Sequence, residues 1–391
     1  MHRLTTFRRL AALALLAAAA LAAPARAQDA VYEKAPKRPV LDDARADTND
    51  WQSYYRFGVK HIQKWPDRAA AAFYWASRMA PDRAEPMYAR WVATWISKRA
   101  MLVEYMNGTL ADSPQARAVD SLQTAALIRD PFVHQGLRLS LEGAMNDRKF
   151  GERSWVWENS RENQAWLAYT EGKFDLATKR FDQALREAPT RTDLHDARAR
   201  AFYGAAKIDS AVAELTIALD DMRRADRKHL VYWYDSKAMF EYSLGVLHAI
   251  RKDYPAAKAA YGRAIEEDIT FHIAHAAIGG LALAQGDTAQ AISAFEDAVT
   301  ANPDDAVIRH DLGVLLLVAG RPAEALPHLR EAVRLAPDFA AARYNYAAAL
   351  EGAGRGEDAA VQYAEFVARA PRNLSDTADA ARARIAALAA R

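Results

Sequence analysis

Residues 306–339 read AVIRHDLGVLLLVAGRPAEALPHLREAVRLAPDF, and this stretch decides the fold. Leu312 and Leu316 lie four residues apart, which places them on one face of a predicted α-helix. Gly320 suits the C-terminal end of that helix, and Pro322 suits the first turn of the next one. The first half of the stretch therefore predicts a helix that ends in a tight turn.

The second half of the stretch predicts a second helix that packs against the first. Ala325, Leu329 and Ala332 follow one another at steps of four and three residues, which is the spacing of a helical face. The small residues Gly313 and Ala325 allow the two helices to approach closely. A hairpin of this kind cannot bury its apolar face alone, so similar hairpins must stack on it.

The same pattern recurs with a period of 34 residues through the C-terminal part of the chain. Three columns of residues keep this spacing: Gly245, Gly279 and Gly313; Ala257, Ala291, Ala325 and Ala359; and Pro303, Pro337 and Pro371. A fixed period in this range predicts an array of stacked helical units.

These residues resemble the tetratricopeptide repeat, whose pattern has a Leu-Gly pair, then an Ala with an aromatic residue four positions later, and a closing Pro. Leu244-Gly245, Ile278-Gly279 and Leu312-Gly313 correspond to the pair, whereas Ile269 stands where the first unit should close with Pro. The resemblance implies an all-α fold, namely a right-handed superhelical solenoid of antiparallel helix pairs.

The helix-pair pattern continues in weaker form toward the N-terminus, and an apolar stripe after Pro371 predicts a helix that covers the end of the array. Ala211 and Ala257 are 46 residues apart, which is 12 more than the period of 34. These surplus residues predict either a lengthened helix or a lobe that presents aromatic residues. The predicted segments are a signal peptide (1–27), an extended polar lead-in (28–50), aromatic-rich degenerate helix pairs (51–153), two repeats (154–225), an insertion (226–237), four repeats (238–373) and a capping helix (374–391).

The N-terminus has the pattern of a secretory signal peptide. A basic start precedes an apolar run at 10–23, and Ala25-Arg26-Ala27 forms an A-x-A cleavage site. Cleavage after Ala27 predicts a periplasmic or secreted bacterial protein without an integral membrane span; an uncleaved anchor is the alternative. Residues 1–27 hold four arginines and no acid, so the formal charge of +2 becomes −2 after cleavage. A nearly neutral protein gives no electrostatic argument for binding nucleic acid.

The sequence shows no pattern typical of catalysis or of a cofactor site. It contains no cysteine and no metalloprotease, nucleophile-elbow, Walker or dinucleotide-binding motif. His272 and His275 are three residues apart on a predicted helix, but no third metal ligand is evident. We therefore predict a protein that is not an enzyme and that needs neither a cofactor nor a metal.

In tetratricopeptide arrays the first helix of each unit lines the concave face, and the resemblance places a partner-binding groove there. Its predicted lining residues are Met239, Tyr242, Val246, Ile273, Gly280, Leu283, Val307, His310, Val314, Leu317, Tyr344 and Ala348. This surface is apolar and carries no Lys or Arg, so it predicts an apolar or helical protein segment as partner rather than an acidic tail. The alternative is that another part of the same chain fills the groove.

Two kinds of function remain open on the sequence alone. The first is a non-enzymatic scaffold of the cell envelope that binds a protein or peptide through the groove. The second is a glycan-binding or enzymatic accessory protein with its site in the aromatic N-terminal region. In that case the exposed pair is either Trp91 with Trp95, four residues apart on one helix, or Trp155 with Trp157.

Overall fold

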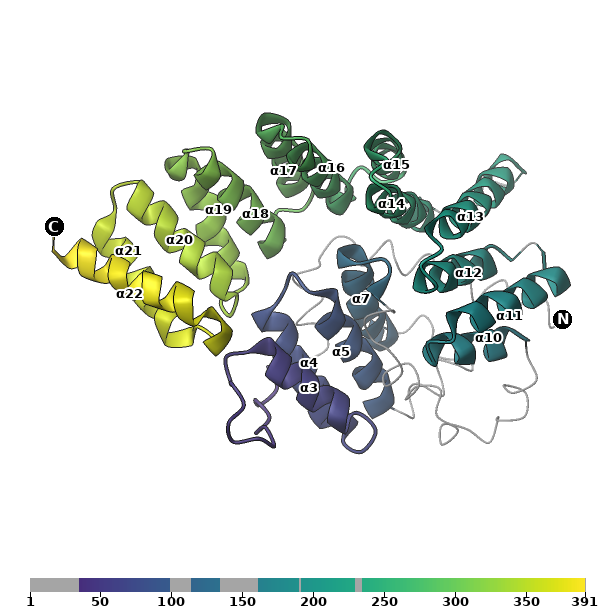
Figure 1. Ribbon diagram of the computed structural model, residues 1–391, viewed down its shortest axis with the longest axis horizontal. Helices are drawn as coiled ribbons and strands as arrows, with labels where there is room; N and C mark the ends of the chain where they lie inside the picture. Colours follow the sequence, from purple (N-terminus) through teal and green to yellow (C-terminus); the bar gives the residue numbers. More distant parts are fainter. Residues whose placement is uncertain (1–34, 99–113, 134–160, 190, 229–233, 391) are drawn as a thin grey trace.

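The computed structural model describes residues 35–98, 114–133, 161–189, 191–228 and 234–390. Within these ranges the chain forms 17 α-helices, one short 3-10 helix and no strand, so the predicted all-α solenoid is confirmed. The helices α10 to α22 follow one another along an arc, and α3, α4, α5 and α7 lie on its inner side (Figure 1).

The arc consists of helix pairs that pack in the order of the sequence. Its helices are α10 (Arg161–Thr170), α11 (Phe174–Glu187), α12 (Thr192–Gly204), α13 (Ile208–Lys228), α14 (Tyr234–Ile250), α15 (Tyr254–Glu267), α16 (His272–Ala284), α17 (Thr288–Ala301), α18 (Ala306–Val318), α19 (Pro322–Leu335), α20 (Ala340–Gly352), α21 (Gly356–Arg369) and α22 (Ser375–Ala389). A 3-10 turn at Arg372–Leu374 precedes the last of them.

Three consecutive pairs, α14 with α15, α16 with α17 and α18 with α19, close on a glycine of the first helix. A Cβ atom added to Gly279 would lie 2.7 Å from the ring of Phe295, and one added to Gly313 would lie 2.4 Å from Leu329. In both pairs the contacting side chain lies 16 residues after the glycine, inside the same repeat. The 34-residue period therefore has a direct cause in local packing.

The turn inside each pair uses a left-handed residue at the same column. The residues with positive φ are Gly172, Ala206, Lys252, Gly286, Gly320 and Gly354. Lys252, at φ 60°, takes a conformation that costs a residue with a side chain roughly 1–2 kcal/mol. The turn is thus kept even where the sequence lacks the glycine that favours it.

The surplus residues before Ala257 extend both helices that flank them. Helix α13 has 21 residues and α14 has 17, whereas the repeats after them use helices of 13 and 14. Part of the insertion predicted at 226–237 thus belongs to the end of α13 and the start of α14, and residues 229–233 lie outside the described ranges.

The helices on the inner side of the arc form what we call the N-terminal block: α3 (Trp51–His61), α4 (Pro66–Met79), α5 (Ala84–Ser97) and α7 (Pro114–Arg129). Consecutive helices of the block pack against each other. A Cβ atom on Gly58 of α3 would lie 2.6 Å from the ring of Phe73 on α4, so the first pair closes as the repeats do. The predicted segment 51–153 is described only in part.

The two ends of the described chain are also held in place. The described lead-in before α3 contains no helix or strand and has turns closed by Asp43 and Asp47, and the indole Nε1 of Trp75 donates a hydrogen bond to the carbonyl of Pro36 at 3.0 Å. At the other end, α22 packs on α21 and buries Ala378 and Ala381, while Leu388 packs against the same apolar cluster. Helix α22 thereby covers the apolar face of the last repeat.

We predict opposite outcomes for two neighbouring glycines of α16. Gly279→Ala should destabilise the protein by about 1–3 kcal/mol, because the new methyl group overlaps Phe295. The Cβ atom added by Gly280→Ala would have no neighbour within 4 Å. This substitution should leave the free energy of unfolding unchanged or raise it by up to about 1 kcal/mol, because alanine favours the helix. Urea unfolding followed by circular dichroism measures both changes. Equal effects of the two substitutions would contradict the packing described above.

Candidate functional site: the concave face and the block docked on it

The predicted groove residues fall into three groups by exposure. Tyr242, Ile273 and Val307 are buried. Gly280 and Leu283 are exposed, the latter at 41%. The remaining seven are half-buried: Met239, Val246, His310, Val314, Leu317, Tyr344 and Ala348. The groove is therefore covered at some positions and open at others.

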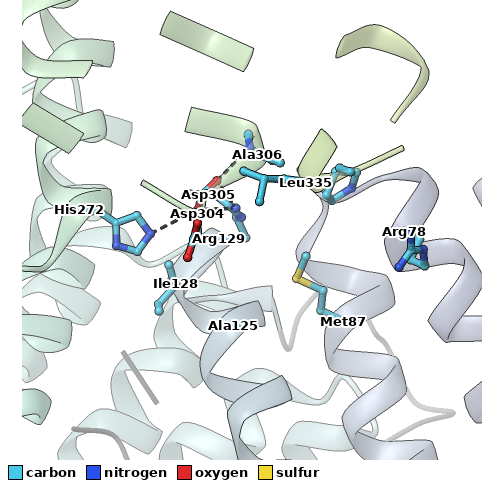
Figure 2. Close-up of a pocket in the computed structure, with 13 residues that line it drawn as sticks. Arg78, Met87, Ala125, Ile128, Arg129, His272, Asp304, Asp305, Ala306 and Leu335 are labelled. Atoms are coloured by element: carbon cyan, nitrogen blue, oxygen red, sulfur yellow. Dashed lines mark hydrogen bonds and ion pairs between the residues drawn. The ribbon is translucent and has the colours of Figure 1, made fainter. Parts of the chain in front are cut away.

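The N-terminal block covers part of the groove. Ile128, at the end of α7, belongs to the same buried apolar cluster as Tyr242 and Ile273. Val307 lines a small cavity of about 60 Å³ whose other walls include Met87 of α5 (Figure 2). The chain's own helices therefore contact this part of the predicted groove.

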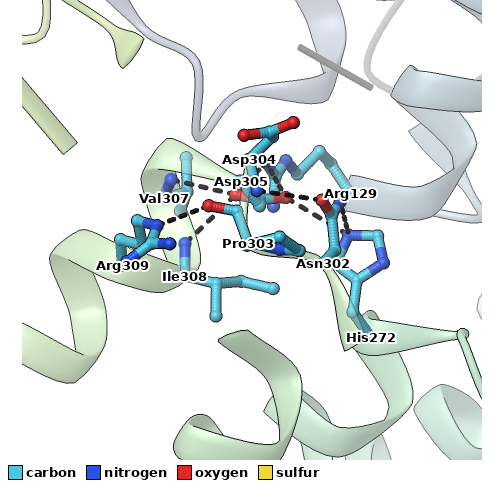
Figure 3. A network of polar contacts seen from close by, with 9 residues as sticks. All are labelled: Arg129, His272, Asn302, Pro303, Asp304, Asp305, Val307, Ile308 and Arg309. Carbon is cyan, nitrogen blue, oxygen red and sulfur yellow. Dashed lines mark hydrogen bonds and ion pairs between the residues drawn. The ribbon is translucent and has the colours of Figure 1, made fainter. Parts of the chain in front are cut away.

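A buried ion pair joins the block to the repeats (Figure 3). Nη2 of Arg129 on α7 donates to both carboxylate oxygens of Asp305, each at 2.7 Å. The side chain of Asp305 is 1% exposed. The same carboxylate caps α18, because its Oδ1 accepts from the backbone N–H groups of Val307 and Ile308 at 2.9 and 3.1 Å. One carboxylate therefore both begins a helix of the array and holds the block.

A buried histidine completes this network. Nε2 of His272 lies 3.3 Å from Oδ2 of Asp305 and 3.2 Å from Nδ2 of Asn302. Burial alone would raise the pKa of Asp305, but the Arg129 guanidinium and the His272 imidazole outweigh it and hold that pKa well below its usual value of 3.8. Asp305 is consequently charged at neutral pH, and its pair with Arg129 is formed.

The loops that close successive repeats supply the other attachment points. Nε of Arg78 on α4 donates to Oδ2 of Asp338 at 3.0 Å. One repeat later, the backbone N–H of Arg372 donates to the carboxylate of Asp47 at 2.6 Å, and its guanidinium donates to the carbonyl of Arg45 at 2.9 Å. The three loops, beginning at Pro303, Pro337 and Pro371, thus hold the N-terminal part of the chain in turn.

A second contact region lies toward the first repeats. The ring of Phe132, just after α7, stacks on Tyr203 of α12 with the centroids 4.3 Å apart. Nη1 of Arg200 donates to the carbonyl of Pro131. The end of α7 therefore touches the array on both sides of α14.

Sequence reasoning missed the residues that hold the block. Arg129 and Asp305 are 176 residues apart, and Arg78 and Asp338 are 260 apart. The only signal in the sequence is an acid directly after a repeat-closing Pro in two successive units, Asp304 and Asp338, and Asp305 lies one position beyond that column. That column gives no information on which arginine meets it, because the block does not share the period of the repeats.

The structure contradicts one of the predicted aromatic sites. Trp95 is 1% exposed, and the indole N–H groups of Trp91 and Trp95 both donate to Oδ1 of Asp120 at 3.2 Å. Trp95 is a core residue, Trp91 is half-buried beside it, and the two share one half-buried acceptor, so they do not form an exposed pair. Trp155 and Trp157 lie outside the described residues.

His272 and His275 do not belong to a group of described side chains that could bind a metal ion. His272 contacts Asp305 as described above, and nowhere in the described part of the chain do three or more His, Asp or Glu side chains gather in a way that could hold a metal ion. Among the same residues, no helix combines the length and the apolar character needed to cross a membrane.

Comparisons with known proteins agree with this architecture. Two family models, both described as tetratricopeptide repeat, match residues 282–325 and 310–374. None of the curated proteins matches the sequence.

Several solved structures share the fold at low sequence identity. The C-terminal part of a TPR repeat-containing protein from Cytophaga hutchinsonii is 18% identical, with a TM-score of 0.45, over 57% of this chain and 94% of that one. PilF of Pseudomonas aeruginosa is 17% identical, with a TM-score of 0.41, over 55% and 92%. YrrB, described as a TPR protein with an unusual peptide-binding site, is 19% identical, with a TM-score of 0.37, over 49% and 92%.

We predict that Asp305→Asn detaches the block while leaving α18 intact. Asparagine is a good N-cap, so the substitution removes mainly the charge that Arg129 needs, and breaking a buried pair in this way costs about 3–5 kcal/mol. All nine tryptophans precede residue 234, so fluorescence reports mainly on the N-terminal half and circular dichroism on all helices. The urea midpoint should fall by both probes, and further by fluorescence. Asp304→Asn, at the exposed neighbouring position, is the control and should change the free energy of unfolding by less than about 0.5 kcal/mol.

The same pair predicts a pH dependence. Because the pKa of Asp305 is lower in the folded than in the unfolded chain, its contribution is complete above the usual value of 3.8 and is lost as the pH falls below it. The difference in the free energy of unfolding between the wild type and Asp305→Asn should therefore shrink from pH 5 to pH 3. Urea unfolding at intervals of about one pH unit around the usual aspartate pKa measures this change. If the difference in the free energy of unfolding stays constant over this range, folding does not lower the pKa of Asp305.

Proposed function

We propose, because residues 282–374 are tetratricopeptide repeats, that this protein is a non-enzymatic scaffold of the bacterial cell envelope. It binds an apolar or helical segment of another protein on the part of its concave face that the N-terminal block leaves open. The observation that carries this proposal is the difference in exposure along the groove: Tyr242 and Val307 are buried, whereas Gly280 and Leu283 are exposed.

The open part of the groove is apolar. Leu283 and Leu317 occupy equivalent positions of α16 and α18, and Gly280 and Val314 occupy equivalent positions one turn earlier. At the ends of α14 and α18, Ile250 and Val318 are also exposed, at 47% and 77%. Exposed apolar patches are typical of protein-binding surfaces.

The polar side chains beside this surface favour an uncharged segment. Nε2 of His310 contacts Nδ2 of Asn345 at 2.9 Å, and Tyr344 packs against Phe366 with ring centroids 5.2 Å apart. No predicted lining position holds a Lys or an Arg, so a carboxylate bound here would lose its hydration without gaining an ion pair. Apolar anchors provide affinity in such grooves, and a few polar groups set the orientation.

We predict that acidic substitutions on the open surface abolish partner capture without unfolding the array. Leu283→Asp and Val314→Asp place an uncompensated charge against the bound apolar segment, which should weaken binding at least tenfold, a free-energy change of about 1.4 kcal/mol. Val361→Asp on α21 is the matched control, because Val361 is 56% exposed and lies outside the predicted lining. The measurement is mass spectrometry of envelope proteins captured by each variant, with circular dichroism as the folding check.

Specific proteins captured by the wild type and by Val361→Asp, but by neither groove variant, support the proposed surface. Equal capture by all four proteins places the binding site elsewhere and excludes the groove. Loss of helicity in Val314→Asp shows that Val314 belongs to the core, in which case Leu283→Asp, at a more exposed position, decides the outcome.

The proposed location depends on the basic start, the apolar run and the A-x-A site of residues 1–27. We predict that the mature protein begins at Gln28 and is recovered from the periplasmic fraction or the medium. N-terminal sequencing of the fractionated protein measures both. A mature chain that still carries Met1 or remains in the cytoplasm contradicts this location, while the groove variants test binding independently of it.

A further inference from the structure

A larger cavity, of about 430 Å³, lies where the N-terminal part of the chain meets the last repeat. The lead-in contributes Arg38 and Asn49 to its wall, and α4 contributes Trp75. The opposite wall includes Phe366 and Arg369 of α21. A cavity of this volume, with apolar rings and a few polar groups, has the size of a site for a small organic molecule.

The cavity has an excess of positive charge. Three arginines line it: Arg38, Arg343 and Arg369. Of these, Arg343 is paired, since its Nη1 donates to Glu365 at 2.6 Å. The one acid in the lining, Asp338, is held by Arg78. Among the described residues no carboxylate pairs with Arg38 or with the exposed Arg369.

One buried hydrogen-bond donor of the cavity has no acceptor among the described residues. This donor is Nε of Arg38, whose guanidinium lies 4.5 Å from the ring centre of Trp75. The side-chain amide of Asn49 forms no hydrogen bond with another described residue. A buried donor without an acceptor is costly, so this arrangement favours a ligand that supplies acceptor oxygens.

We propose that this cavity binds a small organic acid, in which a carboxylate is attached to an apolar or aromatic body. The carboxylate accepts hydrogen bonds from the guanidinium groups of Arg38 and Arg369, whose planar donors match its two oxygens. The apolar body packs beside Trp75 and Phe366. A cation is disfavoured by the same excess charge, and a purely apolar molecule leaves the donors without acceptors.

The site exists only while the N-terminal part is docked, because its two walls belong to segments almost 300 residues apart in sequence. A bound acid therefore bridges the lead-in and α21 and stabilises the docked arrangement. This inference is independent of the proposed partner groove, since none of the predicted groove residues lines the cavity.

Isothermal titration calorimetry with N-acetylphenylalanine tests the proposal on the full mature chain. N-acetylphenylalaninamide is the matched neutral probe, because it has the same body without the charge. We expect the acid to bind at least tenfold more tightly than the amide, the usual effect of one charge-assisted hydrogen bond. Equal binding of the two probes, or binding of neither, overturns the proposal.

Substitutions then locate the site. Arg369→Gln should weaken binding of the acid at least tenfold, and so should Arg38→Gln. Arg369 is exposed, so its substitution leaves the fold intact and keeps the test valid even if Arg38→Gln loosens the lead-in. Arg330→Gln, an exposed arginine of α19 outside the cavity, is the control and should leave the affinity unchanged. Full affinity in Arg369→Gln overturns the assignment.

Two further probes distinguish the source of the carboxylate. 3-Phenylpropanoate represents a free aromatic acid, and a hexapeptide that ends in phenylalanine represents the end of a protein chain. Tighter binding of 3-phenylpropanoate supports a small metabolite as ligand. Binding of the peptide alone, and not of either small acid, contradicts the proposed ligand class.

Discussion

The ion pair between Arg129 and Asp305 is the interaction on which the shape of the molecule depends. Asp305 is almost fully buried, so it needs a compensating charge, and Arg129 supplies it from a segment 176 residues away. The same carboxylate caps α18 and contacts His272. The start of α18 and the docking of the N-terminal block therefore depend on the same side chain, although only docking depends on its charge.

Docking divides the concave face into two parts with different roles. Around Tyr242, Ile273 and Val307 the groove is closed by the chain's own helices. Around Gly280 and Leu283 it stays open and apolar, which is the surface that can bind a protein segment. The repeats thus use part of this face for their own stability, and the proposed partner surface is confined to the part that stays open.

The docked arrangement also creates a chemical environment that neither part has alone. The cavity beside Trp75 combines guanidinium groups from the lead-in with those of α20 and α21. Two of its three arginines have no acidic partner among the described residues, which is unusual at a contact otherwise held by ion pairs such as Arg78 with Asp338. This excess of arginine over acidic side chains is the basis of the ligand site proposed there.

The sequence by itself determined the repeat unit, the order of the helix pairs and the all-α class. It did so because the contacts that define a unit, such as Gly279 with Phe295, join residues 16 positions apart and recur with the period. It also identified the concave positions, but their exposure was decided only by the tertiary structure. The contacts that cover them join a non-periodic block to loops up to 260 residues away, and no local pattern encodes such a pairing. The same holds for the tryptophans, since Trp95 is buried and its indole N–H donates to Asp120 of the next helix in the block.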